Sequence, residues 1–325
     1  MILNFKQLVQ AAKRRKGVTA GVPCPEDEST ILSVIEAKKE GLADFILCGE
    51  GAKVRELLQR HGGRESDFDI QDCPGAEAAV ARIVELGRQG KLHLVLKGFL
   101  PTATLMKPIL DKEKGLRGAN LLSDLLVVEN PAVPPRADGR RGRSGPDVPV
   151  FQDREAAGEL LGLSDGGLNI LPDLAQKKQI VENAVAVFHS LGYAEPRVGI
   201  MAAIETVKDS MPATLDARAL TEMNGRGEIV GCRVYGPLAL DIAVSKEAAE
   251  HKGIRSDVAG RAQVMIVPNI EAGNLLGKAF TYYLKLTVAH VVMGARLPVL
   301  IPSRNESDTD KFHSLALGVL CAACG

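Results

Sequence analysis

The chain has 325 residues, and its 40 lysines and arginines offset its 40 aspartates and glutamates, so the formal net charge is zero. This length exceeds the size at which single hydrophobic cores usually stop growing, and it predicts two lobes. A neutral chain lacks the long-range attraction that draws proteins to nucleic acids and anionic membranes, so neither is an expected partner. The expected partners are therefore small molecules or a second copy of this chain.

Residues 1–17 carry apolar side chains at helical spacing, interrupted by lysine and arginine, which is not the pattern of a signal peptide. The longest apolar stretches are shorter than the roughly 18 residues that a membrane-spanning helix needs. The six cysteines are scattered beside apolar runs, as in reduced cytoplasmic proteins. The six histidines show no paired metal-ligand spacing. We therefore expect a cytoplasmic protein without a metal site.

From residue 17 to residue 129, short apolar runs alternate with amphipathic stretches. The predicted strands are 45–48, 92–96 and 125–128, and the predicted helices are 29–39 and 76–88. Such alternation is typical of a parallel sheet with helical connections. Lys97 and Gly98 follow the strand 92–96, and a further helix begins near Thr102 and Thr104. The N–H groups and hydroxyls at this helix start are of the kind that cradle phosphate.

The stretch that follows, residues 130–150, differs in composition from the rest of the chain. It holds five prolines and the arginines Arg136, Arg140, Arg141 and Arg143, with too little apolar surface to order itself by burial. We interpret it as an exposed loop that marks the crossing between lobes. Contact with a phosphorylated ligand is one role for its arginines, and a solvated surface insertion is the commoner one.

A second alternating series follows, and it predicts another α/β lobe. Its strands are 198–203, 229–234, 264–267 and 291–293, and its helices are 176–190, 241–250 and 274–284. We expect Asp241 to cap the helix 241–250. We expect Gly273 to permit a close approach between a helix and another segment.

The pattern Gly162-x-Ser164-x-Gly166 matches the nucleophile elbow of serine hydrolases. An elbow needs a strand before the serine and a helix after it. Here we expect a helix at 155–161 and a strand at 168–171, which is the opposite order. A serine hydrolase is therefore not favoured.

The last thirty residues carry the densest group of candidate catalytic side chains. An apolar run at 297–301 leads into Ser303 and Arg304, and Asp310 follows six residues after Arg304, with Asp308 as a nearby competitor. A strand, a polar turn and a helix would place them at the carboxyl edge of a sheet, where open α/β proteins bind ligands. Ser307-x-x-Asp310 also matches a capping box, in which the carboxylate only stabilises the helix start, so the pattern alone leaves two roles open for Asp310.

Several ordered segments resemble the phosphate acetyl/butyryltransferase family, and they cover nearly the whole chain. The segments are Tyr235-Gly-Pro-Leu-Ala-Leu-Asp241, Glu247-Ala-Ala-Glu-His-Lys-Gly-Ile254, Val267-Pro-Asn-Ile-Glu-Ala-Gly-Asn274 and Pro302-Ser-Arg304, with weaker matches at Lys97-Gly98 and Asn169-Ile-Leu-Pro-Asp173. The first two look more like the butyryltransferase branch than the acetyltransferase branch.

This resemblance implies two α/β/α lobes with mainly parallel sheets, a fold related to isocitrate and isopropylmalate dehydrogenases, with the active site in the interlobe cleft. The first lobe would comprise residues 1–130, completed by the C-terminal segment 295–325. The second would comprise residues 131–294 and open with a flexible basic insertion at 131–150. A homodimer is also implied.

The resemblance further implies reversible transfer of a short-chain acyl group, butyryl or acetyl: acyl-CoA + phosphate = acyl phosphate + CoA. Coenzyme A is then a substrate, and no metal or redox cofactor is required. Asp310 would be the general base that frees the thiolate for direct attack in a ternary complex. Arg304 would hold phosphate through its planar fork of donors, and Ser303 would donate to the carbonyl or to a phosphate oxygen.

The expected phosphate and CoA contacts form a second set. Lys107 aligns with an arginine that contacts CoA phosphates in the acetyltransferase branch, although a solvated helical lysine is an equally good explanation. The other members of the set are Lys97, Gly98, Thr102, Thr104, Asn269 and Asn274.

Two positions depart from the family pattern. Asn269 stands where aspartate is more frequent, and Asp124 stands where the butyryltransferase branch usually has histidine. These departures leave a degenerate acyl-CoA-binding sensor as an alternative. A metal-dependent hydroxy-acid dehydrogenase would share the fold, but the clustered carboxylates and the arginine-rich motif that it needs are not visible in the sequence.

Overall fold

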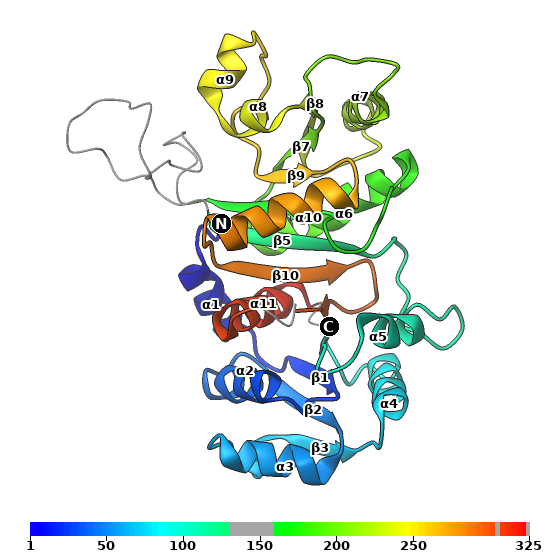
Figure 1. The fold of residues 1–325 in the computed structure, drawn as a ribbon, viewed down its shortest axis with the longest axis vertical. Helices are drawn as coiled ribbons and strands as arrows, with labels where there is room; N and C mark the ends of the chain where they lie inside the picture. The colour runs from blue at the N-terminus through cyan, green and yellow to red at the C-terminus, as the bar shows by residue number, and fades with distance from the viewer. Residues whose placement is uncertain (130–158, 303–305, 323–325) are drawn as a thin grey trace, which may run out of the picture. The chain divides into compact units, whose positions relative to one another are not determined.

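The computed structural model describes residues 1–129, 159–302 and 306–322. These residues form two compact α/β units, which confirms the predicted fold class (Figure 1). The unit called the first lobe comprises residues 5–125 and 288–325, and the unit called the second lobe comprises residues 1–4 and 126–287. The basic insertion predicted at 131–150, with Arg136, Arg140, Arg141 and Arg143, lies outside the described residues.

The first lobe contains a sheet with the strand order β3-β2-β1-β4-β11-β10, in which only β10 runs antiparallel to its neighbour β11. Strand β5 (Ser123–Glu129) begins in this lobe and continues into the second. The other strands are β1 (Thr19–Pro23), β2 (Asp44–Gly49), β3 (Asp69–Asp72), β4 (Leu94–Leu96), β10 (Val288–Met293) and β11 (Val299–Leu300). The helices are α1 (Phe5–Arg14), α2 (Glu28–Lys39), α3 (Gly51–Arg60), α4 (Ala76–Arg88), α5 (Thr102–Ile109) and α11 (Asp308–Cys321), with a short 3-10 turn at Glu65–Asp67.

The core of the first lobe lies along the central strands. Val22 of β1, Leu47 of β2 and Val95 of β4 have no exposed surface. Both faces of these parallel strands are covered, so the strands consist of nearly continuous apolar residues. Each fully buried leucine or valine side chain stabilises the lobe by about 1.5–3 kcal/mol relative to exposure, and the resulting rigid sheet fixes the loops at its carboxyl edge.

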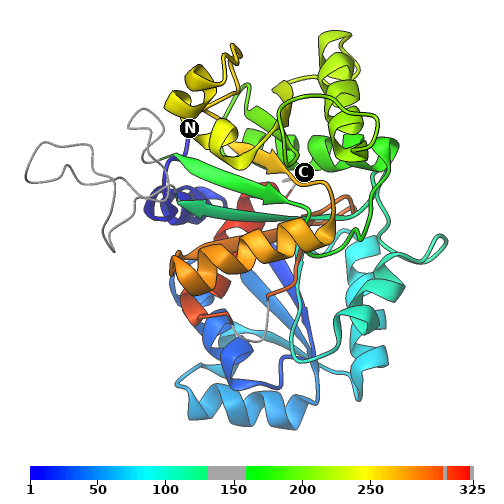
Figure 2. The same ribbon diagram turned by 45° about the horizontal axis from the view of Figure 1, so that its top comes forward.

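The second lobe has the strand order β5-β6-β9-β7-β8, with only β5 antiparallel to its neighbour β6. Figure 2 shows α10 running along β5 and β6, where Gly277 faces Leu126 and Leu163. The strands are β6 (Leu160–Ser164), β7 (Arg197–Met201), β8 (Arg233–Leu238) and β9 (Val264–Ile266). The helices are α6 (Leu174–Ser190), α7 (Pro212–Gly225), α8 (Leu240–Val244), α9 (Lys246–His251) and α10 (Ile270–Lys278), followed by a π-helical turn at Ala279–Tyr283.

The region around Ser164 differs from its prediction. Leu160 and Leu161 begin strand β6, because the neighbouring strand β5 pairs with them, and the expected helix 155–161 is wrong over its described part. No strand forms at 168–171, which are the bends before α6. Ser164 therefore does end a strand, but the next helix begins ten residues later, at Leu174, so the arrangement is still not an elbow.

Two helix predictions in the second lobe also need correction. The expected helix 241–250 is two short helices, and Asp241 lies inside α8 instead of capping it; Ser245 caps α9 by accepting from the N–H of Ala248. The expected helix 274–284 begins earlier, at Ile270, because Asn269 caps it. Across the three described ranges, no helix has the length and apolar character needed to cross a membrane.

Candidate active site

Three neighbouring strands of the first lobe end at the carboxyl edge of its sheet. Strands β1, β4 and β11 are parallel neighbours, and they end at Pro23, Leu96 and Leu300. Lys97 and Gly98 leave β4 beside the end of β1, where the N–H of Gly98 donates to the carbonyl of Pro23. The candidates Ser303 and Arg304 come shortly after β11 in the sequence, and they lie outside the described residues. This edge is where an open α/β sheet binds ligands.

Lys97 and Gly98 are held tightly by this arrangement. The Lys97 side chain is buried, and its Nζ lies 3.2 Å from both the Gly98 and the Leu100 carbonyl oxygens. A Cβ atom at Gly98 would lie 2.1 Å from the carbonyl oxygen of Cys24, closer than any side chain can approach. Glycine is therefore needed at position 98 because the backbones touch there.

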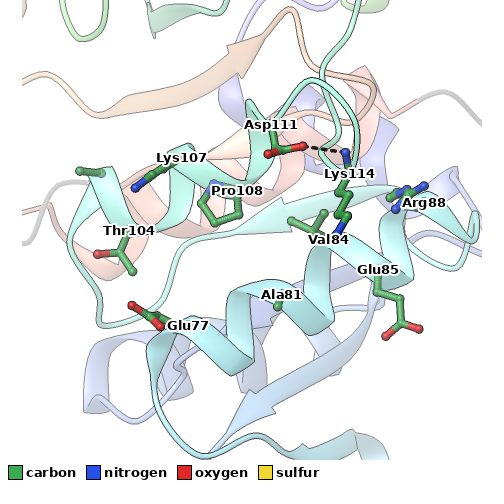
Figure 3. A pocket seen from close by; sticks show the side chains of 11 residues that line it. Glu77, Ala81, Val84, Glu85, Arg88, Thr104, Lys107, Pro108, Asp111 and Lys114 are labelled. Carbon is green, nitrogen blue, oxygen red and sulfur yellow. Dashed lines mark hydrogen bonds between the residues drawn. The ribbon is translucent and has the colours of Figure 1, made fainter.

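Helix α5 supplies the threonine and lysine candidates. It begins at Thr102 after Pro101, and no side chain caps it, so the hydroxyl of Thr102 does not satisfy the helix start. Thr104 and Lys107 line a groove of about 730 Å³ beside α4 (Figure 3). The groove mixes basic and acidic side chains, the basic ones being Arg88, Lys107 and Lys114 and the acidic ones Glu77, Glu85 and Asp111.

Asp310 lies in the first turn of α11, and both of its carboxylate oxygens accept hydrogen bonds. Oδ2 accepts from the hydroxyl of Ser307 at 2.6 Å and from its N–H at 3.2 Å, while the Ser307 hydroxyl oxygen accepts from the N–H of Asp310 at 3.1 Å. The predicted capping box is therefore present. Oδ1 accepts from the N–H of Val288 on β10 at 2.9 Å, a contact that capping does not require.

Asp308, the other carboxylate of this turn, is exposed and faces a different helix. Its Oδ1 accepts from the hydroxyl of Ser29 on α2 at 3.0 Å. The buried Lys311 also donates to Ser29. Asp308 thus belongs to a surface contact between α11 and α2, whereas Asp310 faces the sheet.

Sequence reasoning missed a histidine next to Asp310. His290 on β10 has Nδ1 at 3.3 Å from each carboxylate oxygen of Asp124, and Nε2 at 3.8 Å from Oε1 of Glu306. Burial alone would lower the pKa of His290, but the carboxylates of Asp124, Glu306 and Asp310 outweigh it and raise the pKa to about 9. His290 is therefore a cation at neutral pH.

His313, one turn after Asp310, has a different environment. Its ring stacks on Phe5 of α1 with the centroids 4.4 Å apart. Burial lowers the pKa of His313, and the nearby Asp310 only partly opposes this effect. The two histidines that flank Asp310 therefore differ in charge near neutral pH, with His313 neutral and His290 protonated.

The second lobe contributes its candidates at the start of α10. The Asn269 side chain accepts from the N–H of Ala272 and so caps the helix, and Asn274 donates to the carbonyl of Gly166 at 3.2 Å. A Cβ atom at Gly273 would lie 2.7 Å from the carbonyl oxygen of Asp165, so this glycine permits the close approach that was predicted. Both asparagines thus have structural contacts within the second lobe.

Comparisons with known proteins agree with one another. The family model described as Phosphate acetyl/butaryl transferase matches residues 76–319. Phosphate butyryltransferase of Clostridium acetobutylicum is 36% identical over 322 residues, which are 99% of this chain and 99% of that one. Phosphate acetyltransferase of Rhizobium meliloti is 37% identical over 320 residues, which are 98% of this chain and 94% of that one.

Solved structures give the same picture for the fold. A branched-chain phosphotransacylase from Enterococcus faecalis superposes with a TM-score of 0.76 at 27% identity and covers 94% of this chain and 100% of its own. A 4-hydroxythreonine-4-phosphate dehydrogenase from Klebsiella pneumoniae has a TM-score of 0.53 at 10% identity and covers 94% of this chain and 99% of its own. This second likeness concerns the fold alone, and it confirms the predicted relation to a dehydrogenase fold.

Proposed function

Since this chain belongs to the phosphate acetyl/butyryltransferase family, we propose that it transfers a short-chain acyl group, butyryl or acetyl, between coenzyme A and phosphate. The reaction is acyl-CoA + phosphate = acyl phosphate + CoA. The observation that carries the proposal is the full-length match to relatives named phosphate butyryltransferase and phosphate acetyltransferase. Coenzyme A is a substrate in this proposal, and no metal or redox cofactor takes part.

We assign the proton transfer to Asp310. A free thiol has a pKa of about 8.5, and only its thiolate attacks well, so a base beside the sulfur accelerates the reaction. The carboxylate takes the thiol proton, the sulfur attacks the acyl carbon of the acyl phosphate, and the bond from that carbon to phosphate oxygen breaks as phosphate leaves. The reverse direction uses the same groups.

The hydrogen bonds of Asp310 support this role. Oδ1 is fixed by a backbone N–H of β10, so the carboxylate has a defined position. Oδ2 accepts from the hydroxyl of Ser307, which can rotate away and leave that oxygen to a thiol. Asp308 is a weaker choice, because it is exposed and is engaged with Ser29.

The remaining roles are also proposals. Arg304 holds phosphate, and Ser303 donates to the oxygen on which charge develops. Thr102, Thr104 and Lys107 bind phosphate groups of the substrates from α5, with the edge loop Lys97–Gly98 beside them. Asn269 and Asn274 contribute from the second lobe. Lys97 acts through the backbone carbonyls that it holds, since its Nζ already contacts them.

We also propose a cytoplasmic homodimer. Exposed apolar side chains gather on α10 and the π-helical turn after it, where Leu275, Tyr282, Tyr283 and Leu284 are 72%, 55%, 87% and 37% exposed. Apolar surface of this kind is stabilised when a second copy covers it. Sedimentation of the wild type and of Tyr283→Ser tests this; a monomeric wild type contradicts it.

The function is tested with purified full-length protein. Release of free thiol is measured from acetyl-, propionyl-, butyryl- and isobutyryl-CoA, with and without phosphate. Release that depends on phosphate supports the proposal and ranks the acyl groups. Release without phosphate indicates a hydrolase. Saturable acyl-CoA binding in calorimetry without release indicates the sensor alternative.

A further inference from the structure

His290 lies beside Asp310 in the first lobe, and the mechanism above gives it no task. Its side chain is 19% exposed, and those of its neighbours Asp124 and Glu306 are 15% and 11% exposed. Groups this far from water interact more strongly than groups on the surface. A largely buried charged cluster next to a proposed base therefore needs an explanation.

Strand β10 and helix α11 meet in a way that ties Asp310 to His290. Strand β11 pairs with β10 at Val292 and Val299. The N–H groups of Val288 and His290 find their acceptors on helix α11: the Asp310 carboxylate accepts from Val288, and the Ser314 hydroxyl accepts from His290 at 2.9 Å. Ser314 in turn donates to the Asp310 carbonyl at 2.9 Å. The position of Asp310 is thus set by β10.

The charges around the imidazole come from three directions. Asp124 approaches Nδ1 from β5, Glu306 approaches Nε2 from the residues just before α11, and Asp310 lies in the first turn of α11. Three carboxylates gathered together repel one another, because their charges have the same sign. A cationic imidazole between them offsets this repulsion, and the raised pKa of His290, about 9, is the reciprocal effect.

We infer that His290 is a positioning residue for the transfer reaction: with Asp124 as its counter-ion, it places a positive charge beside the Asp310 carboxylate and helps to hold that carboxylate against β10. The inference rests on the proposed function. His290 acts through Asp310 and does not touch the substrate.

The test is the pH profile of kcat for His290→Asn, which keeps a donor towards Asp124 but has no charge. We expect the acid limb of the profile to move to higher pH by about one unit, and kcat at neutral pH to fall about tenfold. His189→Gln is the matched control, because His189 bonds the Gly231 carbonyl in the second lobe, and its profile should match the wild type. A loss of packing alone would lower kcat at every pH and leave the limb in place.

A second variant makes the test independent of how well His290→Asn folds. Nuclear magnetic resonance of the imidazole protons follows the titration of His290 in the wild type and in Asp124→Asn. We expect the midpoint to fall by at least about one pH unit in the variant, because the counter-ion is gone. If the midpoint is unchanged, the inference about His290 is overturned and the proposed function stands. The same holds if the wild type is active and His290→Asn has the same acid limb. A wild type that releases no thiol overturns the proposed function and the inference with it.

Discussion

Helices α6 and α11 begin with the same motif but use it differently. At α6, the Asp173 side chain accepts from the N–H of Gln176, and the Gln176 side chain accepts from the N–H of Asp173. At α11, Ser307 and Asp310 exchange the same two bonds. The difference is the second oxygen of Asp310, which accepts from Val288 on another element.

The comparison shows that a residue of a capping box can also make a fixed contact with another element. A capping box alone stabilises a helix by about 1 kcal/mol and needs one oxygen of its last member. At α11 the other oxygen is fixed to the sheet, so the carboxylate is oriented as well as present. A capping motif in the sequence therefore does not count against a chemical role.

The largest expected effect comes from changing Asp310, the proposed base. Asp310→Asn keeps an oxygen for the Val288 N–H but cannot accept a proton, so kcat should fall about 100- to 10,000-fold. Gln176→Ala, at the equivalent position of the other helix, should leave kcat unchanged. Steady-state assays of thiol release measure both. Equal kcat values for Asp310→Asn and the wild type would remove Asp310 from the chemistry.

The surroundings of the two helix starts should also differ in pH dependence. The pKa of His290 rises on folding from about 6.5 to about 9. Protonated His290 therefore stabilises the folded state fully below pH 6.5, and this contribution to the free energy of unfolding is lost as pH rises through 9. The loss amounts to at most about 3 kcal/mol. Urea unfolding followed by circular dichroism measures it, since the chain has no tryptophan for fluorescence. His290→Asn should lack this dependence; the same slope in both proteins contradicts the assignment.

The caps themselves should differ in their contribution to stability. Ser307→Ala removes the cap of α11 and the hydroxyl bond to Asp310, so we expect a loss of about 2 kcal/mol in the free energy of unfolding. Asp173→Ala removes only a cap, and we expect about 1 kcal/mol. Urea unfolding of both variants checks this. Equal losses would mean that the hydroxyl bond from Ser307 to Asp310 adds no stability.

A third helix start, that of α5, extends the comparison because no side chain caps it. If α5 binds phosphate groups of the substrate, Lys107→Gln should raise the KM for CoA about two- to fivefold with little change in kcat. Lys53→Gln on α3 is the control, since Lys53 is also an exposed helical lysine. Identical KM values for the two variants would favour the view that Lys107 is only a solvated surface residue.

Local patterns in the sequence predicted much of this structure. The strand and helix alternation predicted the fold class, and the pattern Ser307-x-x-Asp310 predicted the cap of α11. The helix expected at 155–161 was wrong over its described part, because Leu160 and Leu161 pair with β5 and so join the sheet. Asp241 resembles a cap in sequence, yet the chain enters α8 one residue before it.

The His290 cluster could not be predicted, and the reason is physical. His290 and Asp124 lie 166 positions apart, and only the fold brings their side chains together. A histidine in an apolar run more often belongs to the core, so its residue type gives no signal. The unusual Asp124 was the only clue, since a carboxylate facing a largely buried site needs a partner.

The contact at Gly98 limits how the protein can be redesigned. Because the backbones of the β1 and β4 ends touch there, even a methyl group would push the two strands apart at the edge where the ligand loops begin. A library meant to alter acyl-group preference can vary Ala103, which lines the groove beside α4. It should hold position 98 constant, since variants there would be lost to misfolding before selection could act on their substrate choice.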